Sequence, residues 1–462
     1  MRPLTAQWIA NAVAGELVGD VDAVVTSVVK DSREVTPGAM YVAFVGEHVD
    51  GHEYAEVALS QGAVVCLTTL PVAAPHILVD DAAVALGALA RAYLALLRAE
   101  GEVDVIAITG SNGKTTTKDI LAQVLPDSVA PEGSYNNEIG LPLTVLRADS
   151  ATRHLVLEMG ASGPGHISYL TRIAPPDVAA VLMVGTAHAG GYAEADGIAR
   201  AKEEIVAGLL PHGVAVLNAD DAAVAAMAAR APAVITFGQG TDADVRASDV
   251  TVAGGRASFV VHAGGETAQV SQTAQVSLRL VGEHHVTNAL AAIAIAMRCG
   301  LSLEQAAAGV SAAEPVSRHR MAVTERPDGV TIIDDSYNAS PESMRAALRA
   351  LVDVAGGARS FAVIGAMLEM GAASAAAHAD VGHLAVRLGV DHLVVVGEDA
   401  KPAFDTAVRE GSWGDEAVFV YTIGEARGYL AGNLAAGDVV LIKASHGTGL
   451  YQLADELVGE GA

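Results

Sequence analysis

Residues 103–118, VDVIAITGSNGKTTTK, have the types and spacing that best suit chemistry on a phosphorylated ligand. An apolar run from Val103 to Ile108 leads into a glycine-bounded turn and then into Gly113-Lys114-Thr115. A strand, a turn and a helix in this order direct backbone N–H groups and a helix N-terminus at a polyphosphate. Lys114 would neutralise the β- and γ-phosphates, and the Thr115 hydroxyl would hold Mg²⁺.

This loop is shorter than the usual P-loop. The usual motif has a glycine five residues before the glycine of its Gly-Lys pair, and that position is Ile108 here. We expect ATP to be bound by a shortened loop made of Thr109, Gly110, Ser111, Asn112, Gly113, Lys114, Thr115 and Thr116. The alternative is a tight strand–helix turn with a solvated lysine.

Two candidate metal ligands follow other strand-like segments. Glu158 ends the apolar segment 154–158, and His188 follows the apolar segment 178–184. A carboxylate at the carboxyl end of a buried strand beside a phosphate-binding loop is where such enzymes hold Mg²⁺. The alternatives are a solvated strand end for Glu158 and a structural role for His188.

The apolar periodicity divides the chain into three α/β units. Residues 1–98 combine a strand–turn–strand pattern with an Ala-rich helix, which predicts a small N-terminal α/β domain. In residues 99–313, strand-like and helical segments alternate, which predicts a central P-loop ATPase-like domain with a mostly parallel sheet. Residues 314–462 show the same alternation and predict a C-terminal Rossmann-like domain.

The expected elements can be placed along the chain. In the central unit we expect strands at 103–108, 154–158, 178–184 and 214–218, β-hairpins between 244 and 281, and helices at 286–299 and 302–311. In the third unit we expect strands at 330–334, 360–364, 392–397, 417–422 and 438–443. The first of these strands is not followed by G-x-G-x-x-G, so the pattern argues against a dinucleotide cofactor.

Composition limits the class of partner. The chain has 462 residues, about three domains' worth, and is 51% apolar but only 4% aromatic, which fits α/β layers packed with Ala, Val, Leu and Ile. A net charge of −26 argues against nucleic acid and against an anionic membrane surface. The partners expected are therefore small molecules, and an acidic protein must place its few cations locally to bind ATP.

The cysteines and the N-terminus favour a cytoplasmic protein. Cys66 and Cys299 are far apart, lie among apolar residues and have no C-x-x-C partner, so we expect reduced thiols. The first twenty residues lack a basic segment followed by a long apolar core, which argues against a signal peptide. Arg91 interrupts the longest apolar segment, so we expect no membrane insertion. We also expect the protein to be a monomer.

Three motifs resemble the Mur ligases, ATP-dependent amide-forming enzymes that build the peptide stem of peptidoglycan. They are the loop TGSNGKTT, the segment YNNEIGLPLT at 135–144 and the segment DDSYNA at 334–339. The last two resemble the branch that joins D-Ala-D-Ala to a UDP-muramoyl tripeptide. The resemblance runs from about residue 26 to about residue 450, and it implies ATP-driven ligation through an acyl phosphate.

The resemblance implies roles for residues that are uninformative alone. Lys202 matches a lysine that is carbamylated in the family and helps to bind a second Mg²⁺, and His188 matches a metal-site histidine. Arg320 matches an arginine at the entry to the third domain that would stabilise charge on the transferring phosphoryl group. Arg318 is the rival candidate, and either arginine could be a surface residue.

The resemblance also implies binding residues. Asn288 and Asp335 would contact ATP, while the substrate-binding residues would be Ser32, Arg33, Asn137, Tyr337, Asn338 and Lys443. Ser32 and Arg33 would hold the uridine diphosphate, and Lys443 would lie at the dipeptide. Helix capping for Asn288 and a simple turn for Ser32 and Arg33 remain as alternatives.

Two motifs depart from the family pattern. His285 replaces the first Asn of G-x-H-N-x-x-N, and Ala366 replaces the Asp of G-D-M-x-E-L-G, where we carry over only Glu369. These two departures leave the roles of the replaced residues open.

Three other functions are weighed against this interpretation. The ligase that adds the third amino acid of the stem would carry D-N-P-R, which is absent here, and a folate polyglutamylating ligase would not need the first unit. A P-loop switch protein would hydrolyse ATP without depending on a peptide carboxylate. The sequence leaves open whether the third residue of the tripeptide is lysine or diaminopimelate.

Overall fold

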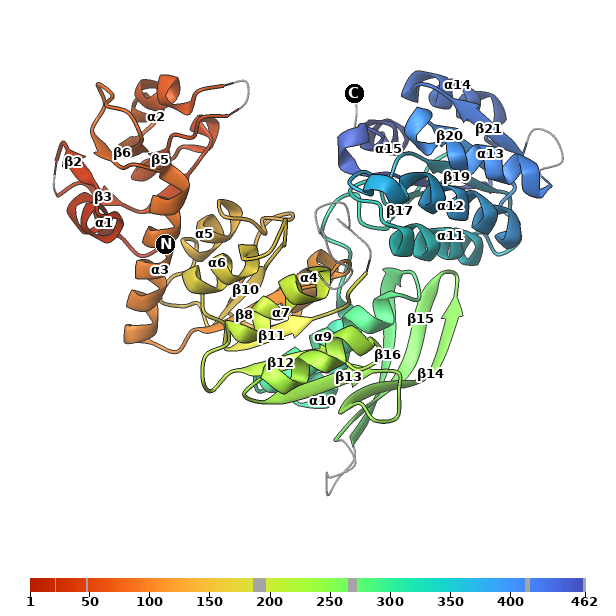
Figure 1. Cartoon of the computed structure of the whole chain (residues 1–462), viewed down its shortest axis with the longest axis horizontal. Coiled ribbons are helices and arrows are strands. Elements are labelled where there is room, and N and C mark those ends of the chain that lie inside the picture. The colour runs from red at the N-terminus through yellow and green to blue at the C-terminus, as the bar shows by residue number, and fades with distance from the viewer. Residues whose placement is uncertain (21, 47–48, 186–196, 265–271, 412–415, 460–462) are drawn as a thin grey trace.

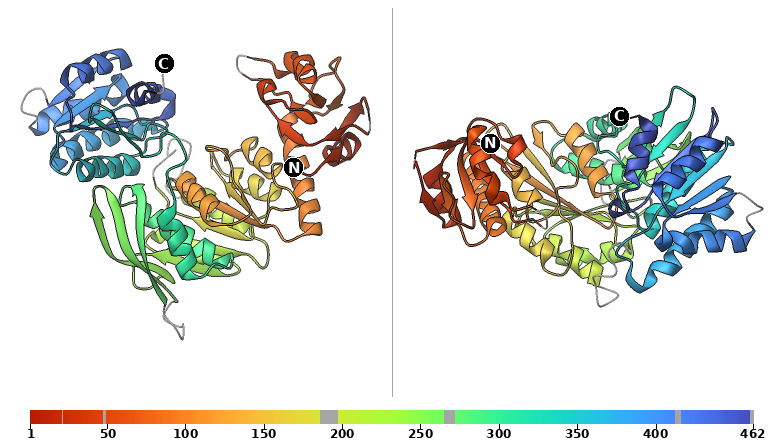
Figure 2. Two further views of the ribbon diagram at one scale, coloured as in Figure 1. Left: turned by 180° about the vertical axis from the view of Figure 1, so that it is seen from behind. Right: turned by 90° about the horizontal axis from the view of Figure 1, so that it is seen from above.

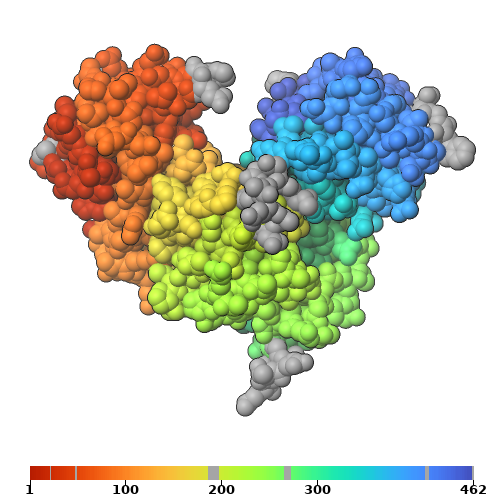
Figure 3. Space-filling view, viewed as in Figure 1, coloured from red at the N-terminus to blue at the C-terminus, as the bar shows by residue number. Residues whose placement is uncertain are grey.

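The computed structural model describes residues 1–20, 22–46, 49–185, 197–264, 272–411 and 416–459. Figure 1 shows three lobes in chain order, with the N-terminal lobe in red and orange and the C-terminal lobe in blue. Both outer lobes adjoin the central one, and the space-filling view in Figure 3 shows a wide opening between them. The views in Figure 2 show the three lobes side by side.

The N-terminal lobe is built on a five-stranded sheet with the order β2-β7-β6-β5-β4. Its strands are β2 (Glu16–Val18), β4 (Ser27–Val29), β5 (Ala39–Val42), β6 (Ala63–Thr68) and β7 (His76–Leu78), and a separate pair consists of β1 (Leu4–Thr5) and β3 (Val24–Val25). The helical elements are α1 (Ala6–Val13), η1 (Ser32–Glu34), η2 (Gly51–Tyr54), α2 (Ala55–Ser60) and α3 (Ala82–Glu100).

Helix α3 joins this lobe to the central one. The Asp81 side chain caps its N-terminus, and the helix passes residue 98 without a break. One apolar core runs through both lobes, from Ile9 through Leu89 on α3 to Leu155 in the central sheet. Among the described residues, α3 is long and apolar enough to cross a membrane, judged by length and composition alone. Half of its most apolar stretch is buried inside the protein.

The central lobe contains a nine-stranded sheet with the order β16-β15-β14-β13-β12-β11-β8-β10-β9. The strands are β8 (Asp104–Thr109), β9 (Ser128–Val129), β10 (His154–Glu158), β11 (Val178–Val181), β12 (Val214–Asn218), β13 (Val234–Gly238), β14 (Val245–Ala253), β15 (Arg256–Ala263) and β16 (Gln272–Val281). The helical elements are α4 (Lys114–Val124), α5 (Gly140–Val145), α6 (His166–Ile173), α7 (Gly197–Ala207), α8 (Ala222–Ala225), η4 (Ala226–Arg230), α9 (His285–Arg298) and α10 (Leu303–Ala312).

Helices cover both faces of the parallel part of this sheet. Alternate residues of β8 and β10 pack toward α4, α9 and α10 on one face and toward α3, α5 and α6 on the other. Strands buried on both faces are continuous apolar runs, which explains why the sequence predicts them well. Because β8 lies between β10 and β11 and runs parallel to both, their carboxyl ends share one edge of the sheet, where a ligand site is expected.

The C-terminal lobe is a six-stranded sheet with the order β17-β18-β22-β19-β20-β21, parallel except for the edge strand β17. The strands are β17 (Ala322–Glu325), β18 (Thr331–Asp334), β19 (Ser360–Ile364), β20 (His392–Val396), β21 (Ala417–Val420) and β22 (Val439–Lys443). The helical elements are α11 (Pro341–Ala355), η5 (Gly371–Ala373), α12 (Ser374–Leu388), η6 (Glu398–Ala400), α13 (Lys401–Glu410), α14 (Ile423–Asn433), η7 (His446–Thr448) and α15 (Tyr451–Val458).

The three-domain α/β fold predicted from the sequence is confirmed, but β9, β13 and β17 are not among the expected strands and one strand is shorter than expected. The strand expected at 178–184 ends at Val181, because the backbone then turns to the phosphate-binding loop, where Met183 O accepts a hydrogen bond from Ser111 N at 3.0 Å. The edge strand β17 is not predicted, because its four residues are partly or fully exposed and give no clear apolar pattern.

The packing of α12 against α13 gives a test of the C-terminal lobe. A Cβ added at Gly382 on α12 would lie 2.0 Å from the backbone oxygen of Ala403 on α13, so Gly382→Ala must push the helices apart. We expect a loss of about 1–3 kcal/mol in the free energy of unfolding. In the control Gly428→Ala on α14, nothing lies within 4 Å of the new Cβ, and we expect a gain of about 0.5–1 kcal/mol. Urea unfolding measures both, and equal midpoints would contradict the packing.

Candidate functional site

A cavity of about 1020 Å³ opens where the carboxyl ends of β8 and β10 face the C-terminal lobe. The central lobe lines it with residues 110–116, 134, 136–138, 160–162, 166 and 202, and the rest of the lining is Arg320 with residues 337–339, 368–371 and 445–447. A second cavity of about 380 Å³ shares Asn112, Gly113 and Thr116 with the first. A ligand at the phosphate-binding loop would therefore reach both cavities.

The eight residues that the sequence singles out run from the end of β8, through the turn at 110–113, into the first turn of α4. Seven of them line the large cavity, while Thr109 is buried and donates a hydrogen bond to Met159 O at 2.8 Å. Gly113 caps α4 with φ of 88°, and a Cβ at this position would lie 2.3 Å from Oδ1 of Asn288. The close approach of α9 therefore requires a glycine at the start of α4.

Lys114 is the first residue of α4. Its Nζ donates a hydrogen bond to Gly110 O at 2.7 Å, which holds the ammonium group over the turn. Burial lowers the pKa of Lys114 to about 8, with Glu158 acting against this shift and Arg320 adding to it. An anionic ligand would favour the protonated lysine.

Thr115 and Glu158 fit a divalent cation. The Thr115 hydroxyl donates a hydrogen bond to Glu158 Oε2 at 3.3 Å, and Glu158 is fully buried, which raises the pKa of its carboxyl group. The other oxygen, Oε1, is buried without a hydrogen-bond partner among the described residues. A buried carboxylate with a free oxygen beside a hydroxyl is a suitable oxygen-ligand pair for Mg²⁺.

Lys202 lies in the same cavity, although its sequence position on α7 gives no sign of this. Its side chain is buried, and burial together with the charge of Lys114 lowers the pKa of Lys202 to about 7. A large share of this amine is therefore neutral near physiological pH. His188, the other expected metal ligand, lies outside the described residues.

Arg320 reaches this site from the segment that joins the central and C-terminal lobes. Its Nη2 donates to Thr115 Oγ1 at 3.3 Å and to Ser134 Oγ at 3.1 Å, and its guanidinium group lies 4.0 Å from the centre of the Tyr337 ring. The rival candidate, Arg318, lines neither cavity. Arg320 therefore brings a positive charge across the lobe boundary to the loop.

The backbone around Arg320 is strained on both sides. His319 and Met321 both have positive φ, 58° and 53°, which is rare for residues with a side chain. His319 Nδ1 lies 2.6 Å from Asp334 Oδ2, and Met321 N donates to Asp335 Oδ1 at 3.2 Å. Two consecutive aspartates at the end of β18 thus hold the residues that flank Arg320.

The second cavity is lined by the two expected ATP-binding residues, Asn288 and Asp335, together with Asn218, His284 and His285. Burial lowers the pKa of His284 to about 4 and that of His285 well below its ordinary value, so both rings are neutral. Asn288 Nδ2 lies 3.1 Å from His285 Nδ1, which can accept its hydrogen bond. His285, which replaces the expected asparagine, thus orients Asn288 through its ring nitrogen.

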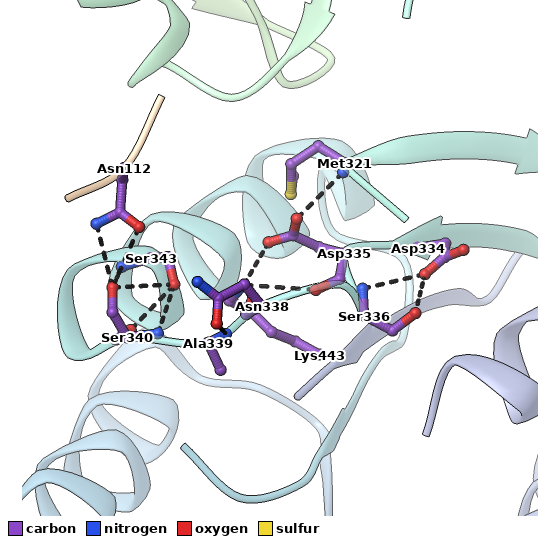
Figure 4. A network of polar contacts seen from close by, with 10 residues as sticks. All are labelled: Asn112, Met321, Asp334, Asp335, Ser336, Asn338, Ala339, Ser340, Ser343 and Lys443. Atoms are coloured by element: carbon purple, nitrogen blue, oxygen red, sulfur yellow. Dashed lines mark hydrogen bonds and ion pairs between the residues drawn. The ribbon is translucent and has the colours of Figure 1, made fainter. Parts of the chain in front are cut away.

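Lys443 is tied down inside the C-terminal lobe (Figure 4). Its side chain is 1% exposed, and Nζ donates to Asp335 Oδ2 at 2.6 Å and to Asn338 O at 2.8 Å. It lines the second cavity and is absent from the lining of the large one. In this arrangement its charge is neutralised by Asp335, so its contact with the dipeptide stays a prediction.

Asn112 connects the loop to the C-terminal lobe directly. Its Nδ2 donates to Ser340 Oγ at 3.1 Å, and Ser340 caps helix α11 (Figure 4). Because of this contact and those of Arg320, residues from two lobes form the site. Neither cavity could have its observed lining without the C-terminal lobe.

Three expected substrate residues line the large cavity. Asn137 Oδ1 accepts from the N–H groups of Ile139 and Gly140 at 3.3 and 2.9 Å, which fixes the turn that leads into α5. Tyr337 lies beneath Arg320, and Asn338 borders both cavities. Ser32 and Arg33 line neither cavity. The Arg33 side chain is 87% exposed on the N-terminal lobe and pairs with Asp31 at 2.6 Å.

Sequence reasoning missed several polar residues of the large cavity. Ser134 and Asn136 lie within or next to the YNNEIG motif, so that motif was an available signal for both. His166 lines the cavity from the start of α6, and its Nε2 lies 3.2 Å from Glu138 Oε2. No local pattern distinguishes His166 in the sequence.

The geometry predicts a large effect for Lys114→Ala. The variant should fold normally but turn over ATP more slowly by a factor on the order of 10³ or more, because it loses a fixed charge beside the transferring phosphoryl group. Lys401→Ala, which removes a surface lysine paired with Glu398, is the control and should leave turnover unchanged. Steady-state ATP turnover and circular dichroism measure the two properties, and near-normal turnover of Lys114→Ala would exclude the phosphate-binding role.

Comparison with known proteins identifies the family of this chain. Family models match the chain as the Mur ligase family catalytic domain (24–94), the Mur ligase middle domain (108–296) and the Mur ligase glutamate ligase domain (319–446). The UDP-N-acetylmuramoyl-tripeptide–D-alanyl-D-alanine ligase of Mycobacterium leprae is 43% identical, with 100% of this chain and 99% of the relative covered. The enzyme of that name from Bacillus subtilis is 33% identical, with 98% of each covered.

Solved structures agree with these relatives. MurF from Acinetobacter baumannii has a TM-score of 0.87 and 31% identity, with 99% of each chain covered. MurF ligase from Thermotoga maritima, solved in complex with ADP, has a TM-score of 0.78 and 28% identity, with 94% of this chain and 98% of that chain covered. From its three matched domains and its relatives over full length, the chain belongs to the Mur ligase family.

Proposed function

We propose that this protein joins D-alanyl-D-alanine to a UDP-N-acetylmuramoyl tripeptide at the expense of ATP, in peptidoglycan precursor synthesis. The observation that carries the proposal is the convergence of Lys114, Lys202 and Arg320 in one cavity with the Thr115–Glu158 pair. Relatives that match this chain over nearly their whole length are named for this reaction.

The reaction places several anionic groups at this convergence. The terminal carboxylate of the tripeptide attacks the γ-phosphorus of ATP, ADP leaves, and an acyl phosphate forms. The neutral amine of the dipeptide then adds to the acyl carbon, phosphate leaves as the amide bond forms, and the nitrogen loses a proton to solvent. Lys114 and Arg320 would face the transferring phosphoryl group and stabilise its charge in both steps.

The two cavities could hold different parts of the substrates. The small cavity, with neutral His284 and His285 and the amide of Asn288, would take the adenosine, and the shared loop residues would take the phosphates. The large cavity would take the end of the tripeptide and the incoming dipeptide. The N-terminal lobe, with Ser32 and Arg33, would hold the uridine diphosphate beyond the opening seen in Figure 3.

Mg²⁺ would supply positive charge between the phosphates and the carboxylate. Thr115 and Glu158 would hold one ion, and His188 with a carbamylated Lys202 would hold a second. Formation of the carbamate joins the neutral amine of Lys202 to CO₂ and releases a proton, which requires the unprotonated form that burial favours. We place the reaction in the cytoplasm and assign it to a monomer.

The proposal is tested by omitting each substrate in turn. We expect steady-state phosphate release only when ATP, the UDP-muramoyl tripeptide and D-Ala-D-Ala are all present, with the ligated product confirmed by mass spectrometry. Free D-alanine should react poorly, because it lacks the length of a dipeptide. ATP hydrolysis that ignores the peptide substrates would favour a P-loop switch protein instead.

Carbamylation of Lys202 makes a separate prediction. Lys202→Ala should be nearly inactive and partly rescued by short carboxylic acids, which can occupy the place of the carbamate, whereas Lys114→Ala should not be rescued. Because the pKa of Lys202 is about 7 in the folded protein, the neutral amine increases as pH rises through 7. Carbamylation at fixed dissolved CO₂ should rise over the same range. Trapping with ¹³C-labelled CO₂ followed by NMR measures it, and a Lys202 that never carries the label would refute the assignment.

The lowered pKa of Lys202 also predicts how the stability of the folded protein changes with pH. Between pH 7 and the unfolded value near 10.5, the unfolded chain binds more protons at Lys202 than the folded chain does. The uncarbamylated protein should therefore become more stable as pH rises through this window, as far as Lys202 contributes. Lys202→Ala removes this contribution and serves as the reference.

A further inference from the structure

Three potential metal ligands lie close together at the end of the central sheet where β8 and β10 begin, opposite the phosphate-binding loop. Asp104 begins β8, His154 begins β10, and the two are direct neighbours in the parallel register. Cys299 caps the C-terminus of α9, which packs on the same face of the sheet. Glu158 lies four residues along β10 from His154, so the cluster is about 13 Å from the ATP-side edge.

The geometry of the cluster fits a single ion. One ligand atom from each of Asp104, His154 and Cys299 lies within 4.8 Å of the others. Zinc bonds of about 2.0–2.3 Å in a tetrahedral site place ligand atoms roughly 3.3–3.8 Å apart. A side-chain adjustment of about 1 Å would therefore close the three ligands around one ion.

His154 gives an independent sign that a ligand belongs here. The residue is only 9% exposed, and its Nδ1 is buried without a hydrogen-bond partner among the described residues. Burial lowers the pKa of His154, so its imidazole is neutral, which is the form that binds a metal. A buried ring nitrogen without a partner is costly unless something satisfies it.

The charged side chains around the cluster nearly balance, so Asp104, itself one of the three ligands, supplies the negative charge closest to a cation. Asp104 and Asp127 act on His154, and Asp104 and Asp177 act on Cys299, while Arg153 and Arg298 oppose them. Arg98 is already paired with Asp177. Burial raises the pKa of Cys299 to about 12, so this residue is a thiol until a metal displaces its proton.

We propose that Asp104, His154 and Cys299 form a binding site for Zn²⁺, with water in the fourth position. A thiolate, an imidazole and a carboxylate are a ligand set that selects Zn²⁺ over Mg²⁺, which prefers oxygen ligands alone. The ion would connect the amino ends of β8 and β10 to the end of α9. This site is separate from the reaction centre and does not depend on the proposed function.

Cobalt substitution tests the site directly, because a thiolate bound to Co²⁺ gives a charge-transfer absorption that oxygen ligands do not. The full-length protein is titrated with Co²⁺ and then Zn²⁺ in the presence of saturating Mg²⁺, which occupies the oxygen-ligand site. We expect one equivalent of Co²⁺ to give this absorption and Zn²⁺ to remove it. Asp104→Asn should weaken Zn²⁺ binding at least tenfold in calorimetry.

The chain offers a matched control, because it has only two cysteines. Cys66 is buried in the N-terminal lobe, so Cys66→Ala should keep the absorption, while Cys299→Ala should lose it. Zn²⁺ should also raise the melting temperature of the Cys66→Ala variant but not that of Cys299→Ala. If the absorption is missing from the parent protein, or persists in Cys299→Ala, the proposal is overturned.

Discussion

The electrostatic repulsion between Lys114 and Arg320, with Lys202 beside them in one cavity, is the constraint on which the rest of this site depends. Lys114, Lys202 and Arg320 line one cavity, and Glu158 is the counter-charge that acts on Lys114. Burial is the main reason why both lysines have lowered pKa values, but Arg320 adds to the shift at Lys114, and Lys114 adds to the shift at Lys202. A polyphosphate relieves this repulsion, so the site is built for an anion that it holds only during the reaction. A less rigid scaffold would let the cations separate.

Elements of two lobes hold these basic side chains in place. The loop and Glu158 are fixed by parallel strands whose carboxyl ends share an edge, and Gly113 lets α9 approach closely enough for Asn288 to contact the loop. Arg320 comes from the connecting segment instead, between two residues of positive φ that are tied to Asp334 and Asp335. The arginine is thus held by the C-terminal lobe but acts on the central one. Docking of that lobe and completion of the site are therefore one event, which would protect an acyl phosphate from water.

The sequence predicts the parts of this arrangement that are local. The loop, Glu158 and the buried strands are contiguous patterns, and continuous apolar runs leave little choice of fold. Lys202 is different, because a lysine on a helix has no local sign of burial, and only the family resemblance pointed to it. The Lys443–Asp335 pair joins residues 108 positions apart, so its geometry depends on strand order in the C-terminal sheet. His285 likewise shows its role only when its ring is seen beside Asn288.

The same reasoning explains how a chain of net charge −26 can bind polyanions at all. At physiological ionic strength the Debye length is about 8 Å, so exposed carboxylates scattered over three lobes are largely screened from the cavity. Charges inside the cavity are screened much less, because little water separates them from the ligand. Lys114 and Arg320 at short range therefore outweigh many anions at long range. The acidic surface and the basic cavity are compatible because burial, rather than net charge, decides which charges the nucleotide meets.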